Sequence, residues 1–288
     1  EYGYEFTEKL CKGNNSRPKL NIRVNTLKIS RDQLLDIFSS YGYIVYKTKY
    51  AKDGLIIDNP RRITSLEEYR NGYFIIQDES SMLVSQTIDP KEGSLVLDLC
   101  SAPGGKSTHM AQIMNNSGKI ISRDIYSHKL HLVQENAHRL GIDIIETEIF
   151  DATKFDEKFR EKADYCIIDA PCSGLGIIRR RPEIKWNRKE EDIQELTKIQ
   201  WEIINNAKSY LKPGGVMVYS TCTISKEENE DMVNKFLLEN SQFKLIGFED
   251  KFNYKKNIEK SKDGYVQLFP HIHNTDGFFI AKFKKINS

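Results

Sequence analysis

The regular alternation of strand-like and helix-like segments constrains the fold of this chain more than any other feature. Beyond Gly93 we expect strands at 94–99, 119–124, 143–149, 163–169, 215–220 and 277–284, and helices at 104–114, 127–140, 190–211 and 227–238. Strands that alternate with helices form a parallel sheet covered on both faces. The sequence therefore predicts an α/β fold with a doubly wound, mostly parallel sheet.

The front of the chain has a different pattern. Short β-prone runs at 19–26, 43–46, 54–57 and 73–76 accompany one helix at 30–41, for which Ser30 is the expected N-cap. Residues 1–75 hold 13 Lys and Arg against 9 Asp and Glu, a mildly basic balance that is compatible with a polyanionic partner. We therefore predict a small α+β segment at 1–77 and an α/β domain at 78–288.

Composition and cysteine count exclude several classes of protein. The chain has no apolar run long enough for a membrane span and no signal-like start. Its five cysteines are odd in number and form no CxxC pair, which argues against a disulfide framework and against a metal site. We expect a cytoplasmic protein without metal. Because the chain begins with Glu, we also expect it to be part of a longer protein.

A glycine-containing loop follows the first strand of the alternating region. In open α/β sheets the ligand binds beyond the carboxyl ends of the strands, and glycines let the backbone approach it closely. A phosphate-binding P-loop would need glycine where Cys100 stands, and the dinucleotide pattern of three glycines is absent. We expect a cofactor loop of another kind, made of Cys100, Ser101, Ala102, Pro103, Gly104, Gly105 and Lys106.

Acidic residues end four of the expected strands: Asp98, Asp124, Asp151 and Asp169. Asp124 is placed to accept hydrogen bonds from a ribose diol, each worth about 1.5–3 kcal/mol to a charged acceptor. Asp151 is placed to meet an adenine amino group. This combination favours a nucleoside cofactor with little phosphate, and S-adenosylmethionine fits that description.

Two cysteines follow the fourth and fifth strands, Cys172 after Pro171 and Cys222 between two threonines. A thiolate that adds to carbon 6 of cytosine makes carbon 5 able to attack a sulfonium methyl group. Only about 3% of an ordinary thiol is ionised at pH 7, so such a site must lower the thiol pKa or supply a base. Asp169 is positioned to contact the ring nitrogen, and Lys106 to orient Asp169.

These motifs resemble those of the RsmB/Sun family of RNA 5-methylcytosine methyltransferases. The resemblance covers about 17–284, and its most specific parts are the cofactor loop, similar to C-A-A-P-G-G-K-T, and the two cysteine motifs at 169–174 and 221–223. The stretches 178–186 and 276–279 resemble members that act on bacterial small-subunit (16S) ribosomal RNA. The resemblance implies that a full-length enzyme of this small-subunit type also carries an N-terminal NusB-like helical domain, which we expect this chain to lack.

The resemblance implies a role for each matching residue. Cys222 is then the nucleophile, Cys172 helps to release the product, and Asp169 and Lys106 support the chemistry. S-adenosylmethionine is then bound by Cys100, Ser101, Ala102, Pro103, Gly104, Gly105, Lys106, Asp124, Asp151 and Asp169. The fold expected from the family is a Rossmann-like class I methyltransferase preceded by a small α+β RNA-binding segment.

Basic and aromatic residues beside a nucleobase pocket can hold a phosphate backbone and a base. We predict RNA contacts by Arg179, Arg180, Arg181 and Trp186, which follow the Cys172 loop, and by Arg23 and Asn25 in the front segment.

Other functions stay open at this point. A DNA cytosine-5 methyltransferase would attack with Cys172 and would carry Glu-Asn-Val, which is absent. A nucleotide-binding ATPase would use Gly105, Lys106 and Ser107 with magnesium. A transfer RNA methyltransferase and an idle RNA-binding module also remain. We expect a monomer that methylates 16S ribosomal RNA.

Overall fold

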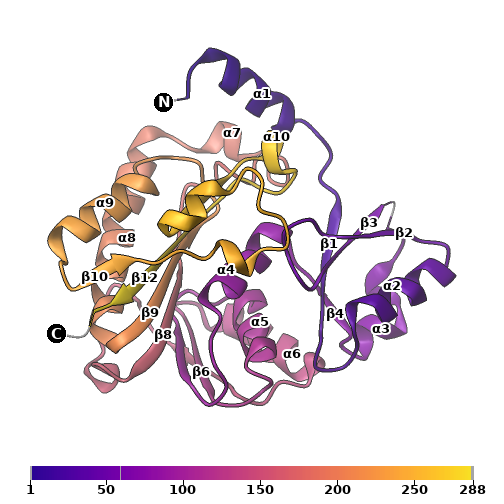
Figure 1. The fold of residues 1–288 in the computed structure, drawn as a ribbon, viewed down its shortest axis with the longest axis horizontal. Coiled ribbons are helices and arrows are strands. Elements are labelled where there is room, and N and C mark those ends of the chain that lie inside the picture. The colour runs from indigo at the N-terminus through magenta and orange to yellow at the C-terminus, as the bar shows by residue number, and fades with distance from the viewer. Residues whose placement is uncertain (1, 59, 287–288) are drawn as a thin grey trace. The chain divides into compact units, whose positions relative to one another are not determined.

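A computed structural model describes residues 2–58 and 60–286. The chain forms two compact units (Figure 1). The loop unit comprises 19–150 and 250–254, and the thiol unit comprises 1–18, 151–249 and 255–288. Because 78–150 belong to the same unit as the front segment, the compact units do not follow the boundary predicted at 77/78.

The front of the loop unit is a four-stranded antiparallel sheet in the order β2-β3-β1-β4. Ser30 caps the helix beside it through a capping box with Gln33, as the sequence predicts for the N-cap. Ile22, Phe38 and Phe74 are fully buried in the core of this segment, which confirms the small α+β segment. Its elements are β1 (Leu20–Val24), α2 (Arg31–Ser40), β2 (Ile44–Lys47), β3 (Gly54–Asp58), α3 (Glu67–Arg70) and β4 (Phe74–Ile76).

The rest of the loop unit is the α/β half that carries the cofactor loop. Its three strands β5, β6 and β7 are parallel and lie in that order. Helix α6 ends at Gly141, whose φ of 73° is a backbone conformation that glycine adopts easily. The elements are α4 (Glu79–Ile88), β5 (Leu95–Asp98), α5 (Gly105–Ile113), β6 (Lys119–Asp124), α6 (Ser127–Leu140) and β7 (Ile145–Ile149).

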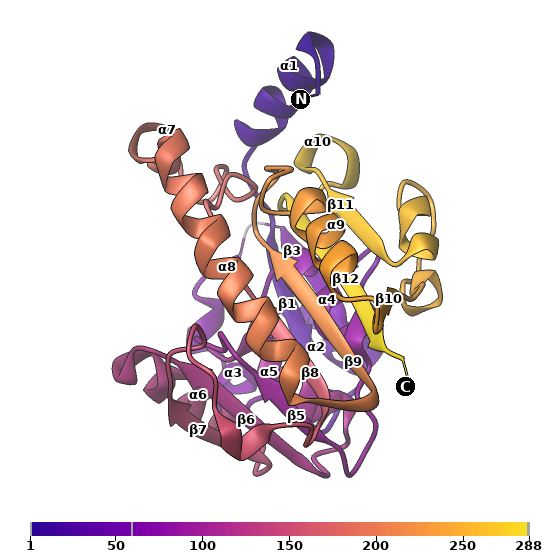
Figure 2. The ribbon, with the colours of Figure 1, turned by 90° about the vertical axis from the view of Figure 1, so that its left-hand side faces the viewer.

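The thiol unit contains a mixed sheet in the order β10-β12-β9-β8, with β11 paired to β12. Strands β8 and β9 are parallel, and α8 packs on both of them (Figure 2). Strand β12 runs antiparallel to β9. The strands are β8 (Ala163–Asp169), β9 (Leu211–Thr221), β10 (Phe243–Leu245), β11 (Tyr265–Leu268) and β12 (Phe278–Lys285). The helices are α1 (Tyr4–Asn14), α7 (Ile184–Asn187), α8 (Glu190–Tyr210), α9 (Glu230–Glu239) and α10 (Pro270–His273).

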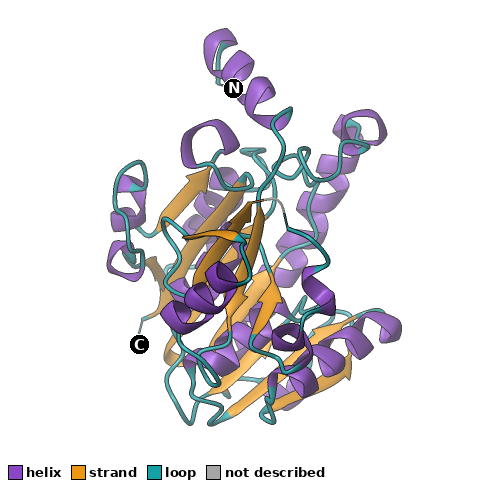
Figure 3. Cartoon of the chain, turned by 90° about the vertical axis from the view of Figure 1, so that its right-hand side faces the viewer, coloured by secondary structure: helices purple, strands orange, loops and turns teal. Residues whose placement is uncertain are grey.

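The predicted fold class is confirmed. The chain has the mostly parallel strands and the covering helices of a Rossmann-like α/β protein (Figure 3). No helix within the described residues is long and apolar enough to span a bilayer.

Candidate active site

Two cysteine side chains meet at the carboxyl ends of β8 and β9 in the thiol unit. Asp169, the last residue of β8, lies in register with Ser220 of β9, so the segments after both strands leave the same edge of the sheet. The sulfurs of Cys172 and Cys222 lie 3.3 Å apart, and both side chains are partly exposed. Ser220 donates a hydrogen bond to Asp169 at 2.9 Å, which holds the carboxylate at this edge.

The surroundings of Cys172 keep it in the thiol form. The hydrogen bond with Cys222 raises the pKa of Cys172 well above its usual range, and burial and the nearby charges of Glu228 and Asp169 act in the same direction. Cys172 is therefore a neutral thiol at neutral pH. Its S–H group can donate to the sulfur of Cys222.

A buried polar network lies beside the two thiols, and sequence reasoning missed it. Glu228 and Ser173 are both fully buried. Glu228 accepts hydrogen bonds from the backbone N–H and the hydroxyl of Ser173, at 2.8 and 2.5 Å. Nothing in the sequence separates Glu228 from its acidic neighbours Glu227 and Glu230, because burial alone distinguishes it.

Two of the arginines expected to contact RNA are engaged within the thiol unit. Arg179 and Arg180 each form an ion pair with Asp276 at 2.6 Å. The Arg179 side chain is only 3% exposed, so we correct its role to an internal ion pair. By contrast, Trp186 in α7 is 84% exposed, and Arg181 is also exposed, as a surface contact requires.

The cofactor loop of the loop unit joins β5 to α5. Gly104 has a φ of 96°, and a Cβ there would lie 3.0 Å from the Val133 Cα atom, so glycine lets α6 pack closely on the loop. Within the described residues no side-chain hydrogen bond caps the start of α5, and the N–H groups at the start of a helix can bind an anionic or polar ligand group. The Ser107 hydroxyl donates to Asp98 at 2.6 Å, a contact that argues against the magnesium role of a P-loop serine.

The residues around this loop fit a nucleoside ligand. Asp124 ends β6, is partly exposed and accepts a hydrogen bond from the Tyr126 N–H through Oδ1 at 3.0 Å, which fixes the orientation of its carboxylate. The buried Ser101 hydroxyl has no hydrogen-bond partner among the residues that the structure describes. A buried hydroxyl without a partner is costly, and a polar ligand group would satisfy it.

Asp151 lies in the thiol unit, two residues after the end of β7. Its side chain is exposed and accepts hydrogen bonds from the N–H and the hydroxyl of Thr153, at 2.9 and 2.7 Å. These bonds hold the pKa of Asp151 below its usual range, so the carboxylate is ionised and is available as an acceptor.

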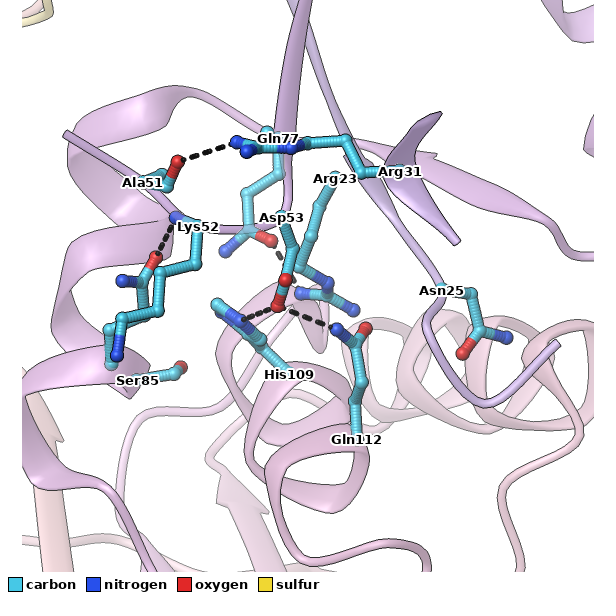
Figure 4. Close-up of polar contacts among 12 residues, drawn as sticks. Arg23, Asn25, Arg31, Ala51, Lys52, Asp53, Gln77, Ser85, His109 and Gln112 are labelled. Atoms are coloured by element: carbon cyan, nitrogen blue, oxygen red, sulfur yellow. Dashed lines mark hydrogen bonds and ion pairs between the residues drawn. The ribbon is translucent and has the colours of Figure 1, made fainter. Parts of the chain in front are cut away.

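Arg23 and Asn25 do not lie on the surface, which corrects the prediction that they contact RNA. The Arg23 guanidinium is 1% exposed and donates to Gln77 (Figure 4). It also donates to the Gly105 carbonyl and to Thr108. Asn25 is 2% exposed and donates to the backbone carbonyls of residues 72 and 140 at 2.9 and 2.8 Å. Arg23 therefore connects β1 to the first turn of α5.

Neighbouring side chains complete this buried network. The Oδ2 atom of Asp53 accepts a hydrogen bond from the Gln112 side chain at 2.9 Å (Figure 4). The same oxygen lies 3.5 Å from Nε2 of His109. Burial lowers the pKa of Arg23 to about 9, so its guanidinium stays charged at neutral pH. Burial also lowers the pKa of His109 to about 4, helped by the charge of Arg23, so His109 is neutral. Within the described residues no group of three or more His, Cys, Asp or Glu is placed to hold a metal ion.

Two protein-family models match the chain. The model described as 16S rRNA methyltransferase RsmB/F matches residues 85–284. The model described as the ferredoxin-like domain of RsmF/B-like methyltransferases matches residues 1–64.

Similar proteins cover nearly all of the chain. A probable ribosomal RNA small subunit methyltransferase B of Bacillus subtilis is 40% identical over 99% of this chain and 64% of its own length. A human 28S rRNA (cytosine(4447)-C(5))-methyltransferase is 35% identical over 99% of this chain and 36% of its own length. The structure titled NSun6 from Pyrococcus horikoshii with SFG superposes with a TM-score of 0.85 at 27% identity, over 100% of this chain and 96% of that one. The chain thus spans less than two thirds of the two curated relatives.

Proposed function

Because the chain belongs to the 16S rRNA methyltransferase RsmB/F family, we propose that it methylates carbon 5 of a cytosine in small-subunit ribosomal RNA. The observation that carries the proposal is the contact between Cys172 and Cys222 at the ends of two parallel strands. A single buried cysteine serves packing, whereas two partly exposed thiols in contact suit covalent catalysis with separate attacking and releasing groups. We expect the protein to act in the cytoplasm, as a monomer.

We assign the attack to Cys222. Its sulfur bonds to carbon 6 of the cytosine, and carbon 5 becomes electron-rich. S-adenosylmethionine supplies the methyl group that carbon 5 takes up. Cys172, a neutral thiol, then gives its proton to the Cys222 sulfur as the bond to carbon 6 breaks, and takes up the proton that leaves carbon 5. Cys222 gives up its own proton to the solvent when it attacks, which is the one proton that the overall reaction sets free, so both cysteines end the cycle as thiols.

Other residues hold the reactants in this proposal. Asp169, oriented by Ser220, contacts the cytosine ring nitrogen, and Lys106 supports that carboxylate. Asp124 binds the ribose hydroxyls, the loop at 100–106 surrounds the rest of S-adenosylmethionine, and Asp151 meets the adenine. The uncapped start of α5 and the buried Ser101 hydroxyl support the assignment of the loop.

The first test is transfer of labelled methyl groups to unmodified small-subunit ribosomal RNA. We expect the label to be recovered as 5-methylcytidine with the wild type and to be absent with Cys222→Ala. Transfer RNA and duplex DNA serve as competing substrates in parallel reactions. Label only in transfer RNA, only in DNA, or in no nucleic acid would contradict the proposed substrate.

The cofactor site has its own test in the Asp124→Asn variant. A bond to a charged acceptor contributes about 1.5–3 kcal/mol, and about 1.4 kcal/mol is a tenfold change in affinity. We therefore expect S-adenosylhomocysteine to bind at least about tenfold more weakly in calorimetry. Asp143→Asn, at an exposed position before β7, is the matched control and should bind as the wild type does. Equal affinity in both variants would remove Asp124 from the site.

A further inference from the structure

The fully buried carboxylate of Glu228 lies close to the proposed catalytic thiols. Glu228 is 0% exposed, and its side-chain partners among the described residues, Ser173 and Gln200, are uncharged. Ser173 donates to it twice, through N–H and hydroxyl, and Gln200 of α8 donates at 3.0 Å. Burying a charge is costly unless hydrogen bonds compensate it, and three donors do so here.

The hydrogen bonds of Glu228 extend to the segments that carry both cysteines. Ser173 follows Cys172 in the chain, and its hydroxyl lies 2.7 Å from the hydroxyl of Thr223, which follows Cys222. Ser173 and Thr223 are both fully buried. The chain Glu228–Ser173–Thr223 therefore connects the segment after β8 to the segment after β9.

Cys172 is held from both sides by this network. Gln200 donates to the Pro171 carbonyl at 2.9 Å, on the N-terminal side of Cys172. Glu228 holds the Ser173 N–H at 2.8 Å, on the C-terminal side. With both neighbouring peptide groups fixed, the sulfur of Cys172 has little freedom to leave its contact with Cys222.

We propose that Glu228 is a positioning residue that fixes the Cys172 thiol against Cys222 and determines which of the two sulfurs attacks the base. This inference rests on the proposed function. The negative charge of Glu228, buried beside the Cys172 turn, opposes a second negative charge on Cys172. Cys172 therefore keeps its proton for the release step, which leaves Cys222 as the sulfur that attacks.

The groups that face Cys172 agree with this assignment. The titratable groups around it are Cys222, Asp169 and Glu228, and all three raise the pKa of Cys172, the hydrogen bond with Cys222 most strongly. The positively charged Arg188 donates through Nε to the Ser173 carbonyl at 2.9 Å. Arg188 therefore binds the backbone of the turn.

The charge is tested by Glu228→Gln, which keeps an acceptor for the Ser173 N–H. Alkylation of each cysteine by iodoacetamide is followed against pH by peptide mass spectrometry. Removing the negative charge of a neighbouring carboxylate lowers the pKa of a thiol by about one unit. The pH midpoint of Cys172 alkylation should therefore fall by about one pH unit. We also expect kcat to fall about tenfold with unchanged KM for RNA and for S-adenosylmethionine. Glu227→Gln, an exposed neighbour, should change neither quantity.

The geometry is tested separately by Ser173→Ala, which removes both hydroxyl contacts and leaves the charge of Glu228 in place. Here kcat should fall while the alkylation midpoint of Cys172 stays where it is in the wild type. An unchanged midpoint and kcat in Glu228→Gln, or a wild-type kcat in Ser173→Ala, would overturn the inference. If the wild type still makes 5-methylcytidine in these experiments, only the role of Glu228 fails and the proposed function stands.

Discussion

At the scale of single residues, the turns that follow two parallel strands bring the side chains of Cys172 and Cys222 together. Cys172 and Cys222 stand in specific motifs, and the structure brings their sulfurs to 3.3 Å. Arg23 was interpreted wrongly, because an arginine is usually exposed and its partners Gln77 and Thr108 lie 54 and 85 residues away. Burial set by such distant partners cannot be read from local sequence.

The buried carboxylate of Glu79 gives a prediction about pH. Glu79 accepts hydrogen bonds from the backbone N–H groups of Tyr50 and Ala51, and burial raises its pKa to about 7. Because this pKa lies above that of the unfolded chain, the stabilising contribution of protonated Glu79 is complete below about pH 4.5 and is lost as the pH rises through about 7.

The Glu79→Gln variant keeps the acceptor oxygen and removes this titration. Relative to the wild type, it should gain up to about 3 kcal/mol in free energy of unfolding between pH 5 and pH 8. Urea unfolding at the two pH values measures the difference, with exposed Glu67→Gln as the control. An equal effect of Glu79→Gln at both pH values would show that Glu79 does not titrate in this range.

At the scale of helices and strands, periodicity and end signals predicted the elements closely. Strands β6 and β8 and helix α6 begin and end where the sequence analysis expected, because acidic residues and glycine mark their ends. Strands β10 and β11 were missed. Each has only three or four residues, and both pair through β12, so long-range pairing and not local pattern defines them.

The link between β1 and α5 gives a prediction at this scale. Arg23→Lys loses the planar group that reaches Gln77, Gly105 and Thr108 together. We expect the free energy of unfolding to fall by about 3 kcal/mol and S-adenosylhomocysteine to bind more weakly, because the start of α5 loses its support. The salt dependence of RNA binding should not change.

Arg61→Lys, at an exposed position of the same front segment, is the control for urea unfolding and calorimetry. If Arg23→Lys matched this control in stability and cofactor affinity but reduced the salt dependence of RNA binding, Arg23 would be an RNA contact after all.

At the scale of the whole molecule, the exposed basic surface around α7 carries the prediction about RNA. Arg181 and Lys185 are exposed beside Trp186. Each phosphate contact to a single strand contributes about 0.7 to the slope of log binding constant against log salt concentration. The double variant Arg181→Ala/Lys185→Ala should therefore lower the magnitude of that slope by about 1.4, measured by fluorescence anisotropy.

The matched control is Lys244→Ala, which removes an exposed charge on β10. It should leave the slope unchanged. Equal slopes for the wild type and the double variant would move the RNA surface away from α7.

The central claim is that Cys222 is the nucleophile, and a trapped adduct tests it most directly. RNA that carries 5-fluorocytidine at the target cytosine cannot lose a proton from carbon 5, so the covalent intermediate should persist. The measurement is tandem mass spectrometry of the nuclease- and protease-digested complex formed with S-adenosylmethionine. We predict that the modified nucleotide is attached to the peptide at Cys222. Attachment at Cys172, or no covalent complex while 5-methylcytidine is formed in ordinary RNA, would contradict the account.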